Sequence, residues 1–182
     1  EAGKRLGEYY PFLEHMPGAD IVISVFDAEL AAKECAVVFL AVPAGTAMGM
    51  AAPLIKAGTR VVDLSADFRL RDPEIYTAWY RQEHTHKDIL HKAVYGLPEL
   101  YAAEISRASL IANPSCYPTS VILGLYAAIK NGLVHTDDIV VDAKSGATGA
   151  GRKAAVGTLF CEVSDNFRAY GLPTHRHTPE IE

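Results

Sequence analysis

The fold is constrained most by an alternation, over the first 115 residues, between short apolar runs and helix-like segments. Residues 20–24, 36–42 and 60–64 are rich in β-branched side chains, which is typical of strands. Residues 44–57 are rich in Ala, Met and Leu and are followed by a glycine, which predicts a helix kinked or restarted at Pro53. Strand, helix and strand in this order indicate a parallel sheet with right-handed crossovers. The sequence therefore predicts a doubly wound α/β fold.

Two of the apolar and polar segments carry a more specific expectation. Residues 36–42 form a continuous apolar run, which is typical of a strand buried on both faces. Residues 72–92 are polar and predict a helix that opens at Asp72-Pro73, with His84, His86 and His91 on a solvated face.

The second half of the chain predicts a helix, a strand and a glycine-rich loop. Apolar residues recur on one helical face from Val121 to Ile129, and Lys130-Asn131-Gly132 supplies the cation and glycine typical of a helix end. Residues 138–142 predict a further strand. A change in composition near Asn113 predicts two domains, residues 1–113 and residues 114–182.

Composition excludes several classes of protein. The formal charge of −5 disfavours a nucleic-acid binder. The longest uncharged stretch is broken by prolines and glycines, so no membrane span is expected, and no secretory signal is apparent in the sequence. Three widely spaced cysteines, Cys35, Cys116 and Cys161, predict free thiols in a reducing compartment.

Cys116 is the strongest candidate for chemistry. Asn113 or Ser115 can cap the helix and Pro118 suits its first turn, so the thiol is expected at a helix N-terminus. Unpaired N–H groups there favour a thiolate and can stabilise an oxyanion. The alternative is a small buried hydrophobic residue. Cys35 and Cys161 lack this setting and are expected to be structural.

Two further motifs are weaker by themselves. The loop from Ser145 to Gly151 holds three glycines after a predicted strand, which lets a ligand approach the backbone, although such loops are more often turns. His175, Arg176 and His177 combine two groups that titrate near neutrality with a guanidinium suited to a carboxylate or phosphate. The alternative is a solvated loop. A zinc site made of Cys116 and the two histidines is the least favoured hypothesis, and no metal is predicted.

Five strings together resemble the N-acetyl-gamma-glutamyl-phosphate reductase family, in the family's order and over essentially the whole chain. They are DLSADFR at 63–69, VYGLPE at 94–99, NPSCYPT at 113–119, KSGATGAGR at 144–152 and HRHTPEI at 175–181. The resemblance implies a partial Rossmann-like parallel sheet, the remainder of an NADP-binding domain, followed by the start of an α+β catalytic and dimerisation domain.

The resemblance also implies an activity, the NADPH-dependent reduction of N-acetyl-L-glutamyl 5-phosphate to the 5-semialdehyde and phosphate in arginine biosynthesis. Cys116 would be the nucleophile that forms an acyl-thioester. His177 or His175 would transfer the proton, with His177 preferred. The expected enzyme acts on a small-molecule substrate and is a cytoplasmic homo-oligomer, either a dimer or a tetramer.

Other positions follow from the same resemblance. Ser145, Gly146, Thr148 and Gly149 would lie beside the nicotinamide, and Pro43 would form part of the cofactor edge. Arg69 and Arg152 are candidates for holding the anionic groups of the substrate, on the basis of charge and motif position.

The sequence departs from the family pattern in a few places. The family usually has glycine at the position of Ser115 and alanine or glycine at that of Ser120. The family's first strand and glycine-rich phosphate loop have no counterpart here, and the family continues beyond the HRHTPEI string. We therefore expect an internal piece of the enzyme that is inactive alone.

Two alternatives stay open at this stage. A related acyl-phosphate reductase, of the aspartate-semialdehyde dehydrogenase or aminoadipyl-phosphate reductase type, would use the same thioester chemistry on another substrate. A non-catalytic protein that kept the fold would have an unreactive Cys116.

Overall fold

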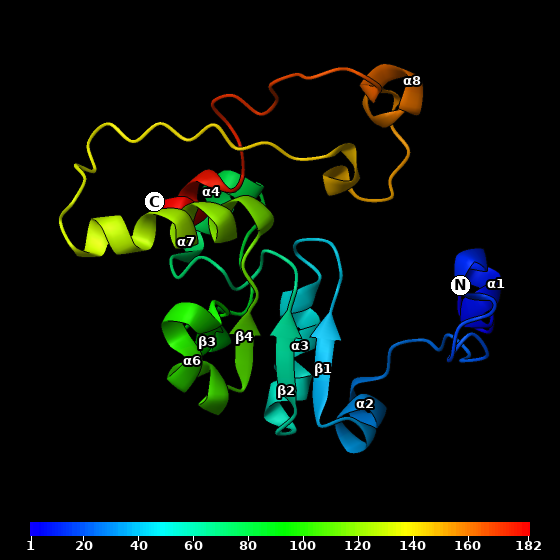
Figure 1. Ribbon diagram of the computed structural model, residues 1–182. Helices are drawn as coiled ribbons and strands as arrows, with labels where there is room; N and C mark the ends of the chain where they lie inside the picture. Colours follow the sequence, from blue (N-terminus) through cyan, green and yellow to red (C-terminus); the bar gives the residue numbers. More distant parts are fainter.

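A four-stranded parallel sheet forms the centre of the computed structural model, which describes all 182 residues. Strands β1 (Val37–Leu40), β2 (Arg60–Asp63), β4 (Leu110–Ala112) and β3 (Ala93–Tyr95) lie side by side in that order. Each neighbouring pair is parallel, and the arrows in Figure 1 all point the same way. The predicted parallel α/β sheet is confirmed.

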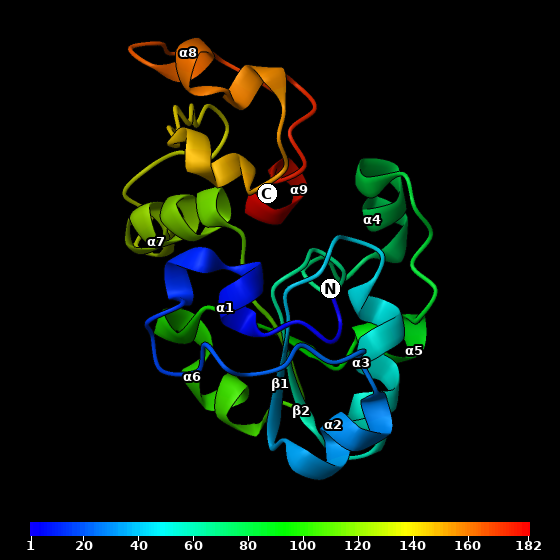
Figure 2. The ribbon, with the colours of Figure 1, turned by 90° about the vertical axis from the view of Figure 1, so that its right-hand side faces the viewer.

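The helix α3 (Ala47–Lys56) makes the crossover from β1 to β2 and carries much of the core. Its residues Ala47, Met48, Ala51 and Leu54 recur at helical spacing and are at most 2% exposed. The helix continues through Pro53 as a single element, and Gly58 follows its end with a φ of +87°. Figure 2 shows α3 and α6 (Pro98–Arg107) on opposite sides of the sheet.

The remaining helices lie outside this layered core, and Figure 1 shows α1 and α8 standing apart from the sheet. Figure 1 shows α4, α7 and α9 beyond the carboxyl ends of the strands, and the chain between α7 and α9 follows a wide arc. Their bounds, with those of the other helices, are α1 (Leu6–Tyr9), α2 (Ala28–Glu34), α4 (Pro73–Tyr80), α5 (Lys87–Leu90), α7 (Cys116–Lys130), α8 (Phe160–Val163) and α9 (Thr178–Ile181). Short 3₁₀ helices span Pro11–Leu13, Ala147–Ala150 and Val156–Thr158. None of the helices has both the length and the apolar character needed to cross a bilayer.

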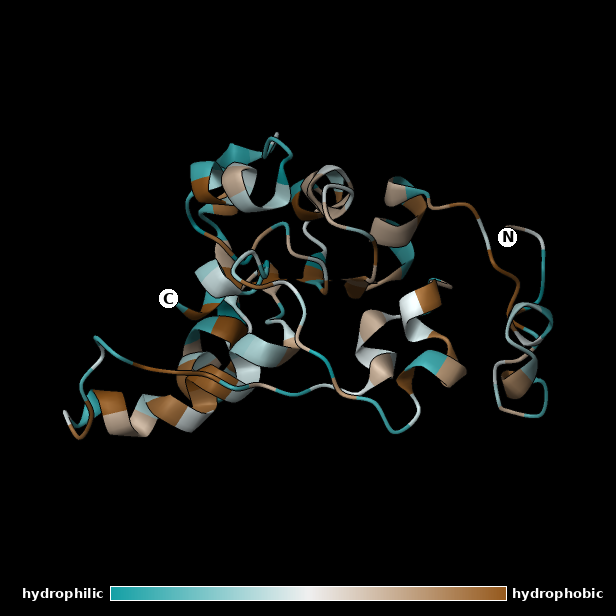
Figure 3. Ribbon diagram, turned by 90° about the horizontal axis from the view of Figure 1, so that it is seen from above, coloured by the Kyte–Doolittle hydropathy of each residue, from teal (hydrophilic) through white to brown (hydrophobic).

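Two predicted strands are wrong. Residues 20–24 form only an isolated antiparallel bridge between Val22 and Arg5, because this stretch folds back on residues 3–7 and not onto the sheet. It is apolar yet exposed, and Figure 3 shows a brown stretch in the chain that leads from the N-terminal helix toward α2. Residues 138–142 form no strand: Asp138 lies in a turn, and no segment of the chain pairs with the residues that follow it.

Two further expectations need correction. The strand β1 is not buried on both faces: Val38 and Leu40 face the core under α3, whereas Val37 and Phe39 on the opposite face are 39% and 65% exposed. The predicted helix over residues 72–92 is broken: Arg81 adopts a left-handed conformation with a φ of 55° and ends α4. Its predicted start is confirmed, since the Asp72 carboxylate accepts the Glu74 N–H at 2.8 Å.

Candidate active site

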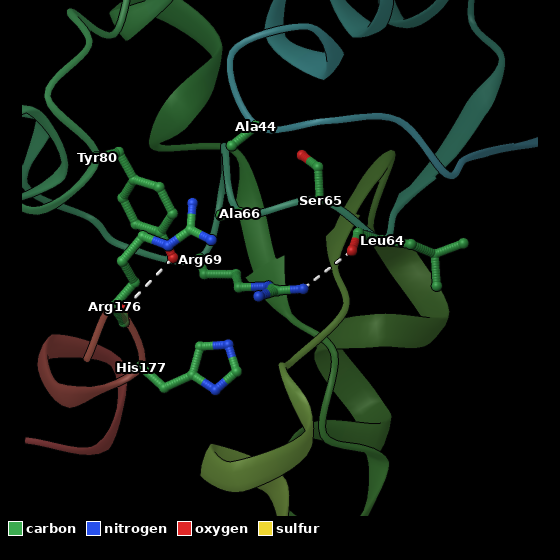
Figure 4. A pocket seen from close by; sticks show the side chains of 8 residues that line it. All are labelled: Ala44, Leu64, Ser65, Ala66, Arg69, Tyr80, Arg176 and His177. Carbon is green, nitrogen blue, oxygen red and sulfur yellow. Dashed lines mark hydrogen bonds between the residues drawn. The ribbon is translucent and has the colours of Figure 1, made fainter. Parts of the chain in front are cut away.

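A cavity of about 200 Å³ lies at the carboxyl edge of the sheet. It is bounded by the loops that follow β1 and β2 and by the segment that enters α9, as Figure 4 shows. Its lining residues are Ala44, Leu64, Ser65, Ala66, Arg69, Tyr80, Arg176 and His177. Ligands of open parallel α/β sheets bind outside the carboxyl ends of the strands, so this place is where a ligand is expected.

Asp67 fixes the shape of this edge. Its buried carboxylate accepts the backbone N–H groups of Gly45 at 2.6 Å and Met48 at 3.0 Å, and the hydroxyl of Tyr76 at 2.8 Å. One side chain thereby satisfies donors at the start of α3 and joins three separate segments. The loop after β1, which contains Pro43 and Ala44, is held in place by this network.

His84 also belongs to the interior, so its expected place on a solvated face is wrong. Its side chain is 0% exposed, with Nε2 2.8 Å from the carbonyl oxygen of Asp67 and the ring edge-on to Phe68 and Tyr76. Burial lowers the pKa of His84, which favours the neutral imidazole. The break between α4 and α5 is what allows this side chain to turn inward.

Cys116 is the first residue of α7 and is exposed, so the expected helix and the position of the thiol at its N-terminus are confirmed. Ser115 occupies the N-cap position, but its side chain makes no bond to the α7 backbone. The thiol is thus accessible and stands beside the unpaired N–H groups of the first turn. No hydrogen bond joins its sulfur to an imidazole.

The two histidines meet the start of α7 through Tyr117. Its ring centroid lies 5.4 Å from that of His175 and 5.8 Å from that of His177, both edge-on, and the two imidazoles are 4.7 Å apart. His177 lines the cavity, and Figure 4 shows it across from Arg69. The structure therefore places both histidines against the residue that follows Cys116.

Both imidazoles are favoured in the neutral form. Burial lowers the pKa of His177, and the neighbouring His175 lowers it further. Burial also lowers the pKa of His175, with a contribution from Arg176. The backbone N–H of His177 donates to Nδ1 of His175 at 3.2 Å, whereas Nδ1 of His177 is buried without a hydrogen-bond partner. A neutral imidazole can accept a proton.

The guanidinium of Arg69 is already engaged within the protein. It donates to the carbonyl oxygens of Asn113 at 2.8 Å and Leu64 at 2.9 Å, and it lies 3.6 Å from the carboxylate of Glu180. These contacts join the DLSADFR loop to the start of the second predicted domain. Arg69 also lines the cavity, so its predicted contact with substrate stays a prediction.

The glycine-rich loop lies elsewhere. Ser145, Gly146, Thr148 and Gly149 are exposed, and none of them lines the cavity beside His177. Arg152 stacks over the ring of Tyr10 with a separation of 4.5 Å. The structure does not bring this loop to the cavity, and its predicted contacts with cofactor and substrate stay predictions.

Sequence reasoning missed Glu180. Its carboxylate accepts the backbone N–H of Ser115 at 2.9 Å and the hydroxyl of Tyr95 at 2.8 Å, and it also accepts the hydroxyl of Ser115. The available signal was its place in the HRHTPEI string, in which it is the only carboxylate. Across the 182 residues, no cluster of three or more His, Cys, Asp or Glu side chains is arranged to hold a metal ion.

Comparison with known proteins gives relatives over the whole chain. The N-acetyl-gamma-glutamyl-phosphate reductase of Halorhodospira halophila is 50% identical over 182 residues, which is 100% of this chain and 52% of the relative. That of Desulforamulus reducens is 48% identical over 181 residues, again 100% of this chain and 52% of the relative. That of Bordetella pertussis is 56% identical over 150 residues, 81% of this chain and 42% of the relative. The chain spans about half the length of these curated relatives.

Two family models divide the chain between them. The model described as semialdehyde dehydrogenase, dimerisation domain matches residues 116–182. The model described as semialdehyde dehydrogenase, NAD binding domain matches residues 1–108. The predicted domain boundary after residue 113 lies between these matches and stays a prediction. Because the second match alone covers more than half of the residues, the chain belongs to the semialdehyde dehydrogenase family.

Proposed function

We propose that this chain forms the cofactor-binding and cysteine-bearing half of an N-acetyl-gamma-glutamyl-phosphate reductase. Such an enzyme reduces N-acetyl-L-glutamyl 5-phosphate to the 5-semialdehyde with release of phosphate, a step of arginine biosynthesis. The observation that carries this proposal is the exposed Cys116 at the N-terminus of α7, next to Tyr117, which packs against His175 and His177. The substrate follows from the names of the relatives, which are N-acetyl-gamma-glutamyl-phosphate reductases.

The geometry at the start of α7 suits acyl transfer to sulfur. The thiolate of Cys116 attacks the acyl carbonyl carbon, a C–S bond forms, and the C–O bond to phosphate breaks. The unpaired N–H groups of the first helical turn stabilise the oxyanion that develops on the carbonyl oxygen. A nicotinamide cofactor, when bound, supplies the hydride that converts the thioester to the aldehyde. The sulfur then leaves as thiolate.

His177 is proposed as the acid or base that transfers the proton in the reaction. It lines the cavity, its Nδ1 has no partner within the protein, and the lowered pKa favours the neutral base. We assign to His175 the role of orienting His177, because Nδ1 of His175 accepts the backbone N–H of His177. The arrangement supports this division of roles between the two imidazoles.

We propose that the nicotinamide ring of the cofactor binds in the cavity at the carboxyl edge of the sheet. Ala44, Ser65 and Ala66 are small side chains at the carboxyl ends of β1 and β2, so the backbone there is open to close approach. We propose NADP as the cofactor, with Pro43 at its edge and Ser145, Gly146, Thr148 and Gly149 beside it. Arg69 and Arg152 are proposed to hold anionic groups of the substrate.

The whole protein is proposed to act as a homo-oligomer, a dimer or tetramer, in the cytoplasm. The description of the family model that matches residues 116–182 as a dimerisation domain supports the oligomer.

The proposal is tested by replacing Cys116 in the full-length protein. The assay follows phosphate-dependent NADP reduction with N-acetylglutamate semialdehyde. Cys116→Ser should lower kcat by more than about 10³-fold, because the nucleophile is lost. The exposed Cys161 gives a matched control, and Cys161→Ser should keep wild-type activity. Survival of most activity in Cys116→Ser would contradict the proposal.

The substrate is tested separately from the chemistry. N-acetylglutamyl, aspartyl and carrier-linked aminoadipyl phosphates are compared side by side with the same enzyme. A clear preference for one of the latter two would overturn the substrate but leave the role of Cys116 in place.

A further inference from the structure

Glu180 is a buried carboxylate at the junction of three segments. Its side chain is 2% exposed, although it belongs to the four-residue helix α9 near the end of the chain. Tyr95, the last residue of β3, and Ser115, the residue before α7, both donate hydrogen bonds to it. A buried carboxylate needs such partners, because an unpaired charge in the interior is strongly unfavourable.

Its charge is balanced by Arg69, whose side chain is 9% exposed. One guanidinium nitrogen lies 3.6 Å from the carboxylate, while two others are held by backbone carbonyl oxygens. Burial raises the pKa of Tyr95, and the charge of Glu180 raises it further, so the phenol remains a donor. The carboxylate is thus held from several directions and has little freedom to move.

This contact joins the two halves of the proposed active site. Ser115 is the N-cap of α7 and directly precedes Cys116, while Glu180 lies one turn after His177, the N-cap of α9. The Ser115 hydroxyl does not cap its own helix, because it donates to Glu180. A shift of this carboxylate would therefore move the histidine segment relative to the start of α7.

We propose that Glu180 is a positioning residue that sets the separation between Cys116 and His177. The inference rests on the proposed function and adds to it a residue that is hydrogen-bonded neither to the sulfur nor to the imidazole. The alternative is a buried ion pair that only stabilises the fold. The two differ in whether the length of the side chain matters once the protein is folded.

The test uses Glu180→Asp in the full-length enzyme, since aspartate keeps the charge but withdraws the carboxylate by one methylene. We expect kcat to fall by about 100-fold, because a misplacement of about 1 Å between reacting groups costs that much. The KM should stay within about threefold of wild type, because a positioning role lowers the rate without removing substrate contacts. Glu180→Gln keeps the length of the side chain, so its kcat should fall less than that of Glu180→Asp. The exposed Glu104 on α6 supplies the control Glu104→Gln.

Hydrogen exchange gives a readout that does not depend on activity. In Glu180→Asp, the peptide covering residues 175–182 should exchange at least about tenfold faster, with the sheet unchanged. A kcat like that of Glu104→Gln would overturn the inference, as would a loss of activity that matches a loss of folded protein. If the wild-type enzyme lacks the reductase activity, the proposed function fails. In that case hydrogen exchange still tests the positioning role by itself, and unchanged exchange in residues 175–182 of Glu180→Asp would overturn it.

Discussion

The chain up to Val121 and the segment from residue 131 to 174 behave differently, although both contain strand-like apolar runs. All 26 residues that are buried as a whole lie between Gly7 and Val121. Val61 in β2 is 0% exposed, whereas Val140 in the predicted strand 138–142 is 91% exposed. Val61 has parallel neighbours on both sides and α3 above it, and Val140 has neither. The same residue type becomes core only where another element covers it.

The difference extends to the candidate site. Tyr117 and Ser115 link part of the candidate site to the packed region, which is the chain up to Val121. The linked residues are Cys116, His175, His177 and Glu180. The glycine-rich loop lies in the exposed segment. Buried polar networks therefore hold one part of the candidate site in place, whereas the glycine-rich loop has no such network.

The largest effect is expected at Asp67. Asp67→Ala leaves two backbone N–H groups and the Tyr76 hydroxyl without their acceptor, and should lower the free energy of unfolding by about 3–5 kcal/mol. Urea denaturation measures it. The matched variant Asp138→Ala in the exposed segment should change stability by less than about 0.5 kcal/mol. Equal effects of the two variants would abolish the contrast.

Core packing should give the next largest effect. Leu54 is 0% exposed, so Leu54→Ala should cost about 3 kcal/mol through lost burial and the cavity that remains. Leu172 is 79% exposed, and Leu172→Ala should cost less than about 0.5 kcal/mol. Both values come from urea denaturation, and a cost above 2 kcal/mol for the second variant (about the lower end for a core leucine) would contradict its exposure.

Acidification should weaken the packed region. Burial lowers the pKa of His84 in the folded protein below its ordinary value of 6.5, so the folded state binds fewer protons than the unfolded chain. The contribution is present above about pH 6.5 and is lost as the pH falls below it. Unfolding measured between pH 7.5 and 5.5 should show this loss, and His84→Gln should reduce its slope. Greater stability at pH 5.5 than at pH 7.5 would contradict the buried neutral imidazole.

The smallest effect is expected for the hydroxyl of Tyr117. It pairs with the Tyr170 hydroxyl at 2.9 Å in an exposed position, so Tyr117→Phe should change the free energy of unfolding by less than about 0.5 kcal/mol. Tyr117→Ala also removes the ring that packs against His175 and His177, and thermal unfolding should separate the two variants. A large loss in Tyr117→Phe would show that the exposed arc is held more firmly than its contacts indicate.

The sequence predicted elements well where local signals and packing agree. The helix over residues 44–57 was predicted from its Ala, Met and Leu content and a terminal glycine, and the strand at 60–64 from its β-branched residues. Both are present with slightly shorter bounds. The helix that begins at Cys116 was predicted from its proline and its apolar face. The strands at 20–24 and 138–142 were wrong because β propensity cannot supply a pairing partner.

The site shows the same division. The strings that contain Cys116, His175 and His177 are visible in the sequence, and the start of the cysteine helix follows from local capping and proline rules. The roles of His84 and Glu180 could not be predicted, since each depends on contacts with residues 17 to 85 positions away.

The sequence by itself determined the order of strands and helices, the start of α7 and the histidine string. Each of these features depends only on residues that are close in the sequence. Only the tertiary structure decided that Asp67, His84 and Glu180 are buried and which groups satisfy them. Whether a polar side chain is buried is determined by the elements that close over it, and those elements come from distant parts of the chain.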